Sequence, residues 1–376
     1  MRRSSEATLS RRVRNRTRST DWSPRCVWVY FQQRSKLPAT CRESVSPGAP
    51  RPWSLSTTHR KRSCERSWEH GDCFIKAQPA CAWRAEGTGT VPSHTSDVIL
   101  SIGDLVLDIT IVPDGPLRPD DDRPARIGLG GGGQAANFCA WGAALGEPVR
   151  LVTRVGDDER GRRLVADLEA RGVEVCPVWA AEPTGAIAVL VGPDGERTMA
   201  TQRGASLGLR PDDLLEAWFG DVKLIHIPAY SLFVDPLGKA ARAAISLVRD
   251  AGGMLSIDLS SVAGLQEYGP SKMAYDLARL KPELLFGTAA EVAKIGVAVE
   301  HLAQVPVIKL GSAGCSVFGR QIPAPSVRHV DGTGAGDAFA AAFCAAWLHG
   351  ATPIEAAERA VIVASEAVTR TGARPN

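Results

Sequence analysis

The residues best suited to chemistry stand in the segment Asp331–Asp337, which reads Asp-Gly-Thr-Gly-Ala-Gly-Asp. Gly334, Ala335 and Gly336 stand at the predicted start of a helix, where unobstructed backbone N–H groups and the helix dipole favour an anion such as a transferring phosphoryl group. The carboxylate of Asp337 would compete with that anion, which suggests a second task, accepting a proton from a nucleophilic hydroxyl group. The alternative is that Asp337 only caps the helix, because Asp is a favoured capping residue.

A second glycine-rich segment, Gly128–Gly133, matches the G-x-G-x-x-G pattern of dinucleotide-binding proteins. That pattern requires a strand directly before it, but residues Arg118–Arg126 are rich in Pro and Asp. A dinucleotide-dependent oxidoreductase is therefore a weak alternative. Binding of NAD(P) without binding of ATP would favour it.

Strands and helices alternate through most of residues 96–376. The predicted strands are short, apolar and bounded by turn residues: Val98–Asp104, Leu105–Val112, Leu151–Val155, Leu224–Ile227, Met254–Asp258, Leu284–Phe286, Val307–Leu310 and Val327–Val330. The predicted helices are Gln134–Leu145, Asp158–Arg171, Ala338–His349 and one that begins at the capping box Thr352–Glu355. This alternation predicts an α/β fold with a mostly parallel sheet.

Two segments of residues 96–376 contain strands without helices between them. Ile109–Gly128 and Val173–Met199 hold short strands around turns that contain Pro and Gly. We expect these two pieces to form a small β flap, or lid, against the main sheet.

Five motifs in the same order resemble those of the ribokinase-like carbohydrate kinases of the PfkB family. They are Gly132–Asn137, Gly156–Asp158, Lys309–Gly311 with Gly314, Asp331–Phe339 and Val368–Ala373. The resemblance covers residues 97–376 and none of the first 95. It implies a three-layer α/β sandwich with a mostly parallel central sheet and a small β lid. It also implies a kinase that transfers the γ-phosphoryl group of ATP to a hydroxyl of a sugar or nucleoside.

The resemblance assigns the catalytic roles to the segment Asp331–Asp337. Asp337 would be the general base, and Gly334, Ala335 and Gly336 would form the anion hole for the γ-phosphate of ATP. These roles are physically consistent, because phosphoryl transfer depends on positioning and charge stabilisation more than on covalent chemistry.

The resemblance also implies an acceptor-binding set. Asp108 and Asn137 would bind hydroxyl groups of the acceptor, while Gly132 and Gly133 would flex as the lid closes and excludes water. The alternatives are that Asp108 is a surface carboxylate at the end of a strand and that Asn137 is a residue of the first helical turn.

The nucleotide and the metal ion would be bound by residues of the last third of the chain. The resemblance gives the nucleotide to Lys309, Gly311, Gly314 and Thr333, and Mg²⁺ to Glu291. Whether a monovalent cation is also needed does not follow from the sequence.

Three positions depart from the family pattern. The magnesium-related N-x-x-E motif begins with Thr288, whose hydroxyl would have to order a water molecule on Mg²⁺. Gly332 replaces a Thr and is expected to loosen the corner before the anion hole. Val361 replaces an Asn near the adenine, so the adenine contacts are expected to be mostly apolar.

Several further residues have competing interpretations. His226 lies in an apolar strand and is expected to be a core histidine rather than a catalyst. Tyr230 follows that strand, where a loop could reach the substrate. Arg203 could meet an acidic or phosphorylated substrate, although an ordinary surface Arg is the simpler interpretation. The cysteines of the body are expected to be buried free thiols in a reducing cytoplasm: Cys139, Cys176, Cys315 and Cys344.

Residues 1–95 differ in character from the rest of the chain. They hold 18 basic and 7 acidic residues, a net charge of +11, whereas residues 96–376 carry −8. Four interpretations remain: a basic arm for nucleic acid, a transit peptide, a metal site, or upstream sequence translated from a misplaced start, with the true start near Val91. The metal site would use His59, Cys64, His70 and Cys73. We expect this basic extension to be disordered, because few aliphatic residues are available to offset the chain entropy.

The sequence thus predicts one kinase domain over residues 96–376, with ATP and a sugar or nucleoside as its partners. The main alternative is a sugar or nucleotide sensor of the same fold with weakened catalysis, which Thr288 and Val361 suggest. The net negative charge of residues 96–376 argues against binding of nucleic acid. No apolar run approaches the ~18 residues of a membrane span, and the expected location is the cytoplasm. A homodimer through the lid is left open.

Overall fold

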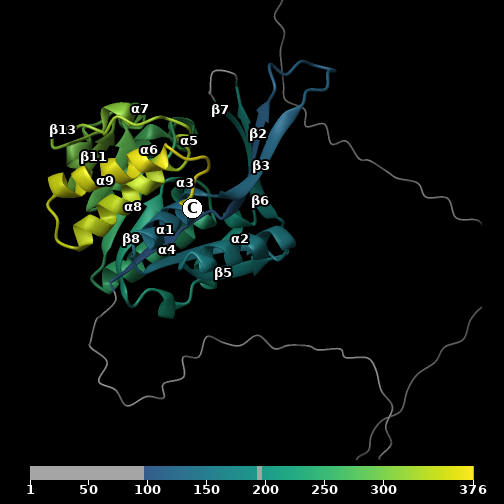
Figure 1. Cartoon of the computed structure of the whole chain (residues 1–376). Helices are drawn as coiled ribbons and strands as arrows, with labels where there is room; N and C mark the ends of the chain where they lie inside the picture. The colour runs from purple at the N-terminus through teal and green to yellow at the C-terminus, as the bar shows by residue number, and fades with distance from the viewer. Residues whose placement is uncertain (1–96, 193–196, 376) are drawn as a thin grey trace, which may run out of the picture. The chain divides into compact units, whose positions relative to one another are not determined.

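The computed structural model describes residues 97–192 and 197–375 (Figure 1). The expectations for residues 1–95, including disorder, the metal site and the misplaced start, lie outside the described residues. Among the residues described, no helix is both long and apolar enough to cross a membrane.

A large sheet forms the centre of the described body. Its strand order is β13-β12-β11-β10-β9-β8-β1-β4-β5. Neighbouring strands from β11 to β5 pair in parallel, and only the pairs β11–β12 and β12–β13 are antiparallel. The predicted α/β fold with a mostly parallel sheet is therefore confirmed. The strands are β1 Val98–Ile102, β4 Val149–Gly156, β5 Glu174–Ala180, β8 Val222–Pro228, β9 Met254–Asp258, β10 Leu284–Thr288, β11 Val305–Lys309, β12 Cys315–Val317 and β13 Arg320–Ile322.

Helices cover both faces of this sheet. Alternate residues of β1 enter two separate hydrophobic clusters. Ile99 lies in the first cluster and Leu100 in the second, as expected for a parallel sheet buried on both faces. Residues of α1, α2, α8 and α9 belong to the first cluster, and residues of α4, α5 and α6 to the second. The result is a three-layer sandwich. The helices are α1 Gln134–Ala144, α2 Glu159–Ala170, α3 Tyr230–Phe233, α4 Leu237–Asp250, α5 Val262–Tyr268, α6 Pro270–Leu280, α7 Ala289–Ile295, α8 Ala335–Leu348 and α9 Pro353–Ala367.

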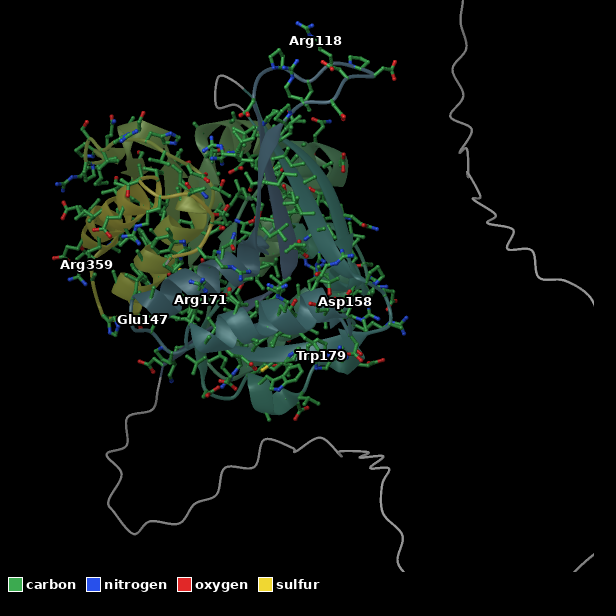
Figure 2. The ribbon with its side chains drawn as sticks, turned by 45° about the vertical axis from the view of Figure 1, so that its right-hand side comes forward. Arg118, Glu147, Asp158, Arg171, Trp179 and Arg359 are labelled. Atoms are coloured by element: carbon green, nitrogen blue, oxygen red, sulfur yellow. The ribbon has the colours of Figure 1, made fainter. Side chains whose placement is uncertain are left out.

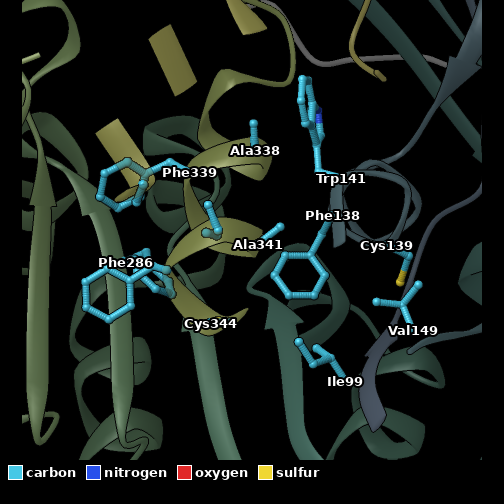
Figure 3. Close-up of a cluster of buried hydrophobic side chains, with 14 of the residues drawn as sticks. Ile99, Phe138, Cys139, Trp141, Val149, Phe286, Ala338, Phe339, Ala341 and Cys344 are labelled. Atoms are coloured by element: carbon cyan, nitrogen blue, oxygen red, sulfur yellow. The ribbon is translucent and has the colours of Figure 1, made fainter. Parts of the chain in front are cut away.

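The first cluster holds α8, the helix that carries Asp337, against the sheet. Phe286 of β10 packs edge-on against Phe339 and Phe343 of α8, with ring centroids 6.1 and 5.3 Å apart (Figure 3). The fully buried ring of Phe138 lies in the same cluster and comes from α1. Because α1 and α8 share this core, residues at their N-terminal ends are positioned relative to each other.

A smaller sheet with the order β3-β2-β6-β7 forms the lid. Its strands are β2 Val106–Pro113, β3 Ala125–Gly132, β6 Thr184–Val191 and β7 Arg197–Gly204, and β2, β3 and β7 extend beyond the helical layers (Figure 1). Figure 2 shows Arg118 at the far end of the β2–β3 hairpin.

The predicted lid piece Val173–Met199 is wrong at its start. Its first strand, β5, pairs in parallel with β4 from Arg150 to Gly156 and closes the edge of the large sheet. Val173 and Cys176 are buried there. A short strand of mixed polarity looks the same in the sequence whether it joins the edge of the main sheet or the lid, so composition could not separate the two.

The segment around α8 and α9 is partly as predicted. The capping box of α9 is confirmed: the Thr352 hydroxyl accepts the N–H of Glu355, and the Glu355 carboxylate accepts the N–H of Thr352. The predicted strand Val327–Val330 is wrong, because these residues are not in a strand and the N–H of Val330 donates to the carbonyl of Val368 at the end of α9. Helix α8 begins at Ala335, three residues earlier than predicted.

Candidate active site

Asp337 lies in the first turn of α8 and is 9% exposed. The helix is capped by Gly334, whose φ of 76° is the left-handed conformation that favours glycine, and a Cβ there would collide with the carbonyl of Ala373. The carboxylate of Asp337 does not cap its own helix. Its Oδ2 accepts a hydrogen bond from Nδ2 of Asn137 in α1, over 3.1 Å.

Burial raises the pKa of Asp337 to about 7. The nearby carboxylates of Asp258 and Asp108 raise it further, whereas the hydrogen bond from Asn137 and the charge of Lys309 lower it. A carboxyl group with a pKa near neutral can accept a proton at physiological pH more readily than an ordinary Asp.

The turn before α8 is held by Asp331. Its Oδ1 accepts the N–H and the hydroxyl of Thr333, both over 2.7 Å, and its Oδ2 accepts the N–H of Gly372 over 3.0 Å. Arg197 of the lid strand β7 also contacts Asp331 and Thr333. These contacts fix the corner that Gly332 was expected to loosen. The Thr333 hydroxyl thus stabilises this turn through its hydrogen bond to Asp331.

A cavity of about 480 Å³ opens beside the first turn of α8. Its lining includes three of the predicted nucleotide residues, Lys309, Gly311 and Gly314, but not Thr333. The small residues Ala335 and Gly336 also line it. The rest of the lining is largely apolar and includes Val327, Phe339, Val361, Ala364 and Val368. Such a cavity can take a ligand with a polar anionic part and a flat apolar part.

Lys309 brings a positive charge to this cavity. Its Nζ donates to Oδ2 of Asp258 over 2.6 Å, and it lies close enough to Gly336 that a Cβ there would be 3.3 Å from Nζ. Asp258 and Glu291 raise the pKa of Lys309 despite its burial, so the ammonium is charged. Sequence reasoning missed Asp258, although its place at the carboxyl end of a parallel strand is where ligands bind in α/β sheets.

Glu291 is buried at the start of α7. Its Oε2 accepts the N–H of Thr288 over 2.7 Å, and the Thr288 hydroxyl accepts the N–H of Glu291. The Thr288 hydroxyl that was expected to order a metal-bound water therefore holds Glu291 in place. No group of three or more His, Cys, Asp or Glu side chains within the described ranges could hold a metal ion alone.

Asp108 of β2 faces the glycine run of β3. A Cβ on Gly132 would collide with the carboxylate of Asp108, and a Cβ on Gly133 would collide with the backbone of Asp104. Burial raises the pKa of Asp108 to about 6, while the charge of Arg374 lowers it. Its Oδ1 is buried without a hydrogen-bond partner, so this oxygen is free to accept a hydrogen bond.

The family of the chain can be decided with this geometry in view. The sequence profile of the pfkB family carbohydrate kinases matches residues 97–376. The chain belongs to this family. It is therefore a phosphotransferase with an alcohol group as acceptor, and the predicted resemblance is confirmed.

Similar proteins agree with this membership. An ATP-dependent ribose-1-phosphate kinase of Halopiger xanaduensis is 31% identical over 291 residues, which cover 73% of this chain and 93% of that protein. Fructokinase-1 of rice, Oryza sativa, is 30% identical and is matched over 66% of this chain and 82% of its own length. Mouse ribokinase is 27% identical, over 65% and 80% of the two chains.

Solved structures confirm the ribokinase-like fold. Adenosine kinase from Sinorhizobium meliloti superposes with a TM-score of 0.67 and 23% identity, over 74% of this chain and 96% of that one. A putative ribokinase II from E. coli in complex with ATP and Mg²⁺ gives a TM-score of 0.65 and 24% identity, over 73% and 94%.

The pfkB fold also explains why the oxidoreductase alternative is not favoured. The glycine run that matches G-x-G-x-x-G lies in β3, paired antiparallel to β2 in the lid sheet. Two of its glycines make room for side chains, Gly131 for Arg374 and Gly132 for Asp108. These two glycines serve close packing in this structure.

The remaining predicted residues of the pfkB domain divide into confirmed and corrected ones. His226 is a core histidine, as predicted: its ring stacks on Phe138 at 3.9 Å, and burial lowers its pKa to about 3. Arg203 is not an ordinary surface residue, because it pairs with Asp104 and donates to the carbonyl of Tyr230. All four body cysteines are buried, as predicted.

Proposed function

We propose that the chain transfers the γ-phosphoryl group of ATP to a hydroxyl of a sugar or nucleoside, with Asp337 as the general base. One observation carries this proposal: Asp337 lies between the part of the site that contains Asp108 and the cavity that contains Lys309. Its carboxylate contacts Asn137 on the side of Asp108, and its neighbour Gly336 lines the cavity that contains Lys309. A hydroxyl bound beside Asp108 and a phosphate bound beside Lys309 would meet at Asp337.

The reaction follows from this placement. The acceptor hydroxyl gives its proton to the carboxylate of Asp337 as its oxygen attacks the γ-phosphorus, and the bond to the β–γ bridging oxygen breaks to release ADP. The first-turn N–H groups of α8, at Ala335 and Gly336, have no partner within their helix, and Ala335 makes only a 3.4 Å hydrogen bond to the carbonyl of Gly332. Both can stabilise the charge on the phosphoryl oxygens. The ammonium of Lys309 adds to this stabilisation.

Mg²⁺ fits this site only in combination with the nucleotide. Mg²⁺ is usually bound by one or two carboxylates together with substrate phosphates and water. Glu291 can supply the carboxylate, because only its Oε2 is used by Thr288 and its charge already acts on Lys309. When bound, the ion would neutralise charge on the ATP phosphates.

A screen for ADP release tests the proposed function. The full chain is incubated with ATP, Mg²⁺ and, in turn, neutral sugars, sugar phosphates, sugar acids and nucleosides. We expect release that depends on one class of acceptor. Arg203 is already paired with Asp104, which leaves it poorly placed to favour a phosphorylated or acidic acceptor. Release that is the same with and without every acceptor would overturn the proposal.

The rate should depend on pH through Asp337. A base must be ionised, and its pKa of about 7 means that kcat/KM for the acceptor rises through neutral pH and levels above it. Below pH 7 the value should fall about tenfold per pH unit, more steeply where Asp108 is also protonated. Initial rates from pH 5.5 to 9 measure this acidic limb of the pH–rate profile. A profile that is flat over this range would contradict the role of Asp337.

A second copy of the chain is the partner we propose for the outer face of the lid. Ile109 pairs with Leu129 and with Ala188 in the register of the lid sheet, so these apolar side chains share a face opposite to Asp108. Leu129 is 69% exposed on that face. A soluble protein rarely leaves such an apolar strip uncovered.

Size-exclusion chromatography with light scattering tests this pairing. The unmodified chain should have the mass of a dimer, and Leu129→Arg should shift it toward the monomer. Met199→Arg is the matched control, because Met199 is similarly exposed but lies on the opposite face of the lid. A monomeric wild type, or equal effects of both variants, would refute the pairing.

A further inference from the structure

Arg374 is a buried arginine near the C-terminal end of the described chain, and its side chain is 5% exposed. This end of the chain lies beside α1 and β3 (Figure 1). The guanidinium donates to three acceptors: Nε to Oδ1 of Asn137 over 3.2 Å, and two terminal nitrogens to the carbonyl of Gly132 and to Asp167, each over 3.0 Å. Arg374 thus joins α1, β3 and α2 at the acceptor side of the site.

The contact with Arg374 determines how the amide of Asn137 is turned. A guanidinium can only donate hydrogen bonds, so Oδ1 of Asn137 must face Arg374. The NH₂ group of Asn137 then faces the carboxylate of Asp337, to which it donates over 3.1 Å. Without Arg374 only the Asp337 carboxylate would hold the amide in this orientation, and a protonated Asp337 would stabilise the rotated amide by donating its hydroxyl to Oδ1.

We propose that Arg374 is a positioning residue for phosphoryl transfer, which orients Asn137 toward Asp337 and holds the carbonyl of Gly132 beside the acceptor. The inference rests on the proposed function, because Asp337 and the acceptor site have their roles there. The guanidinium of Arg374 directs its hydrogen bonds to protein groups, at Asn137, Gly132 and Asp167. Its effect therefore passes through Asn137 and Gly132.

The charge of Arg374 acts in the same direction as its hydrogen bonds. The groups that face Asp337 are Asp258 and Asp108, which raise its pKa, and Asn137 and Lys309, which lower it. Arg374 stabilises the charge on Asp108. Loss of Arg374 should therefore make Asp108 harder to ionise, and rotation of the released Asn137 amide would remove the hydrogen bond that lowers the pKa of Asp337. We expect the acidic limb of the rate profile to move to higher pH.

The experiment compares Arg374→Met and Arg374→Lys with Arg171→Gln as the matched control. Arg171 contacts the same Asp167 and the carbonyl of Pro375, so it also anchors the end of the chain, but it does not touch Asn137. Figure 2 shows its place at the C-terminal end of α2. Kinetic constants from pH 5.5 to 9 and melting temperatures are measured for each variant.

We expect Arg374→Met to move the acidic limb up by about 0.5–1 pH unit and to lower kcat/KM at pH 6.5 about tenfold. Arg374→Lys keeps the charge but cannot reach three acceptors at once. It should leave the limb near its wild-type position and lower kcat about threefold. Arg171→Gln should change only the melting temperature. If the Met variant is insoluble, Arg374→Gln takes its place, because it also removes the charge.

An unmoved limb in the neutral variant, or an equal kinetic loss in Arg171→Gln, would overturn the positioning role. Asp337→Asn is measured alongside to separate this failure from failure of the proposed function. Full activity of Asp337→Asn would refute the role of Asp337 as the general base. An inactive Asp337→Asn, together with an unmoved acidic limb in the neutral Arg374 variant, would refute only the inference about Arg374.

Discussion

Replacement of Asp337 by Asn should lower kcat at least ~10²-fold, because the base contributes roughly 10²–10⁴ to the rate. The dissociation constant for ATP should change little. Asn has the shape of Asp and can still accept the hydrogen bond from Asn137, so the first turn of α8 should keep its geometry. Steady-state kinetics and calorimetric titration of a non-hydrolysable ATP analogue measure the two quantities.

Glu355→Gln is the matched control for Asp337→Asn. Glu355 is also a carboxylate in the first turn of a helix, but it serves only the capping box of α9. Its replacement keeps an acceptor for the N–H of Thr352, so it should change stability little and leave kcat unchanged. A kcat of Asp337→Asn within threefold of the wild type would remove Asp337 from the mechanism.

The ion pair Lys309–Asp258 carries the second large prediction. The carboxylate of Asp258 is 1% exposed, and Lys309 is its charged partner at 2.6 Å. Lys309→Met would leave a buried charge without a partner, which costs about 3–5 kcal/mol. At about 2–4 °C per kcal/mol, the melting temperature should fall by roughly 6–20 °C. Phosphoryl transfer should also decline, because the ammonium lies beside Gly336.

A double variant separates loss of the pair from loss of packing. In Lys309→Met with Asp258→Asn the buried charge is gone, so most of the lost stability should return. Activity should not return with it. Lys239→Met is the exposed control: its pair with Asp235 is 69% and 55% exposed and should contribute less than about 1 kcal/mol. A double variant as unstable as Lys309→Met would show that the carboxylate of Asp258 is not the cause.

Local signals in the sequence predicted the elements that position the site. The apolar runs ended by turn residues gave the parallel strands, and Thr352 and Glu355 marked the start of α9, because strand burial and helix capping depend on neighbours within a few positions. The stretch of small residues before Asp337 likewise identified the first turn of α8. In each case the physical cause lies within the segment itself.

The parts that sequence reasoning missed depend on contacts between distant segments. Asn137 meets Asp337 across 200 positions and Arg374 across 237, so no local pattern reports that Arg374 turns the Asn137 amide. Asp258 was only the end of a strand until the fold placed Lys309 beside it. The sheet to which β5 belongs was equally undetermined, since its partner strand is chosen by the tertiary fold.

The most direct test of the account is ³¹P NMR of the reaction mixture with the acceptor that the ADP screen selects. We expect a new phosphomonoester resonance that grows in step with ADP in the wild type and is at least ~10²-fold slower in Asp337→Asn. Inorganic phosphate in place of the phosphomonoester, or equal rates in the two proteins, would refute phosphoryl transfer with Asp337 as its base.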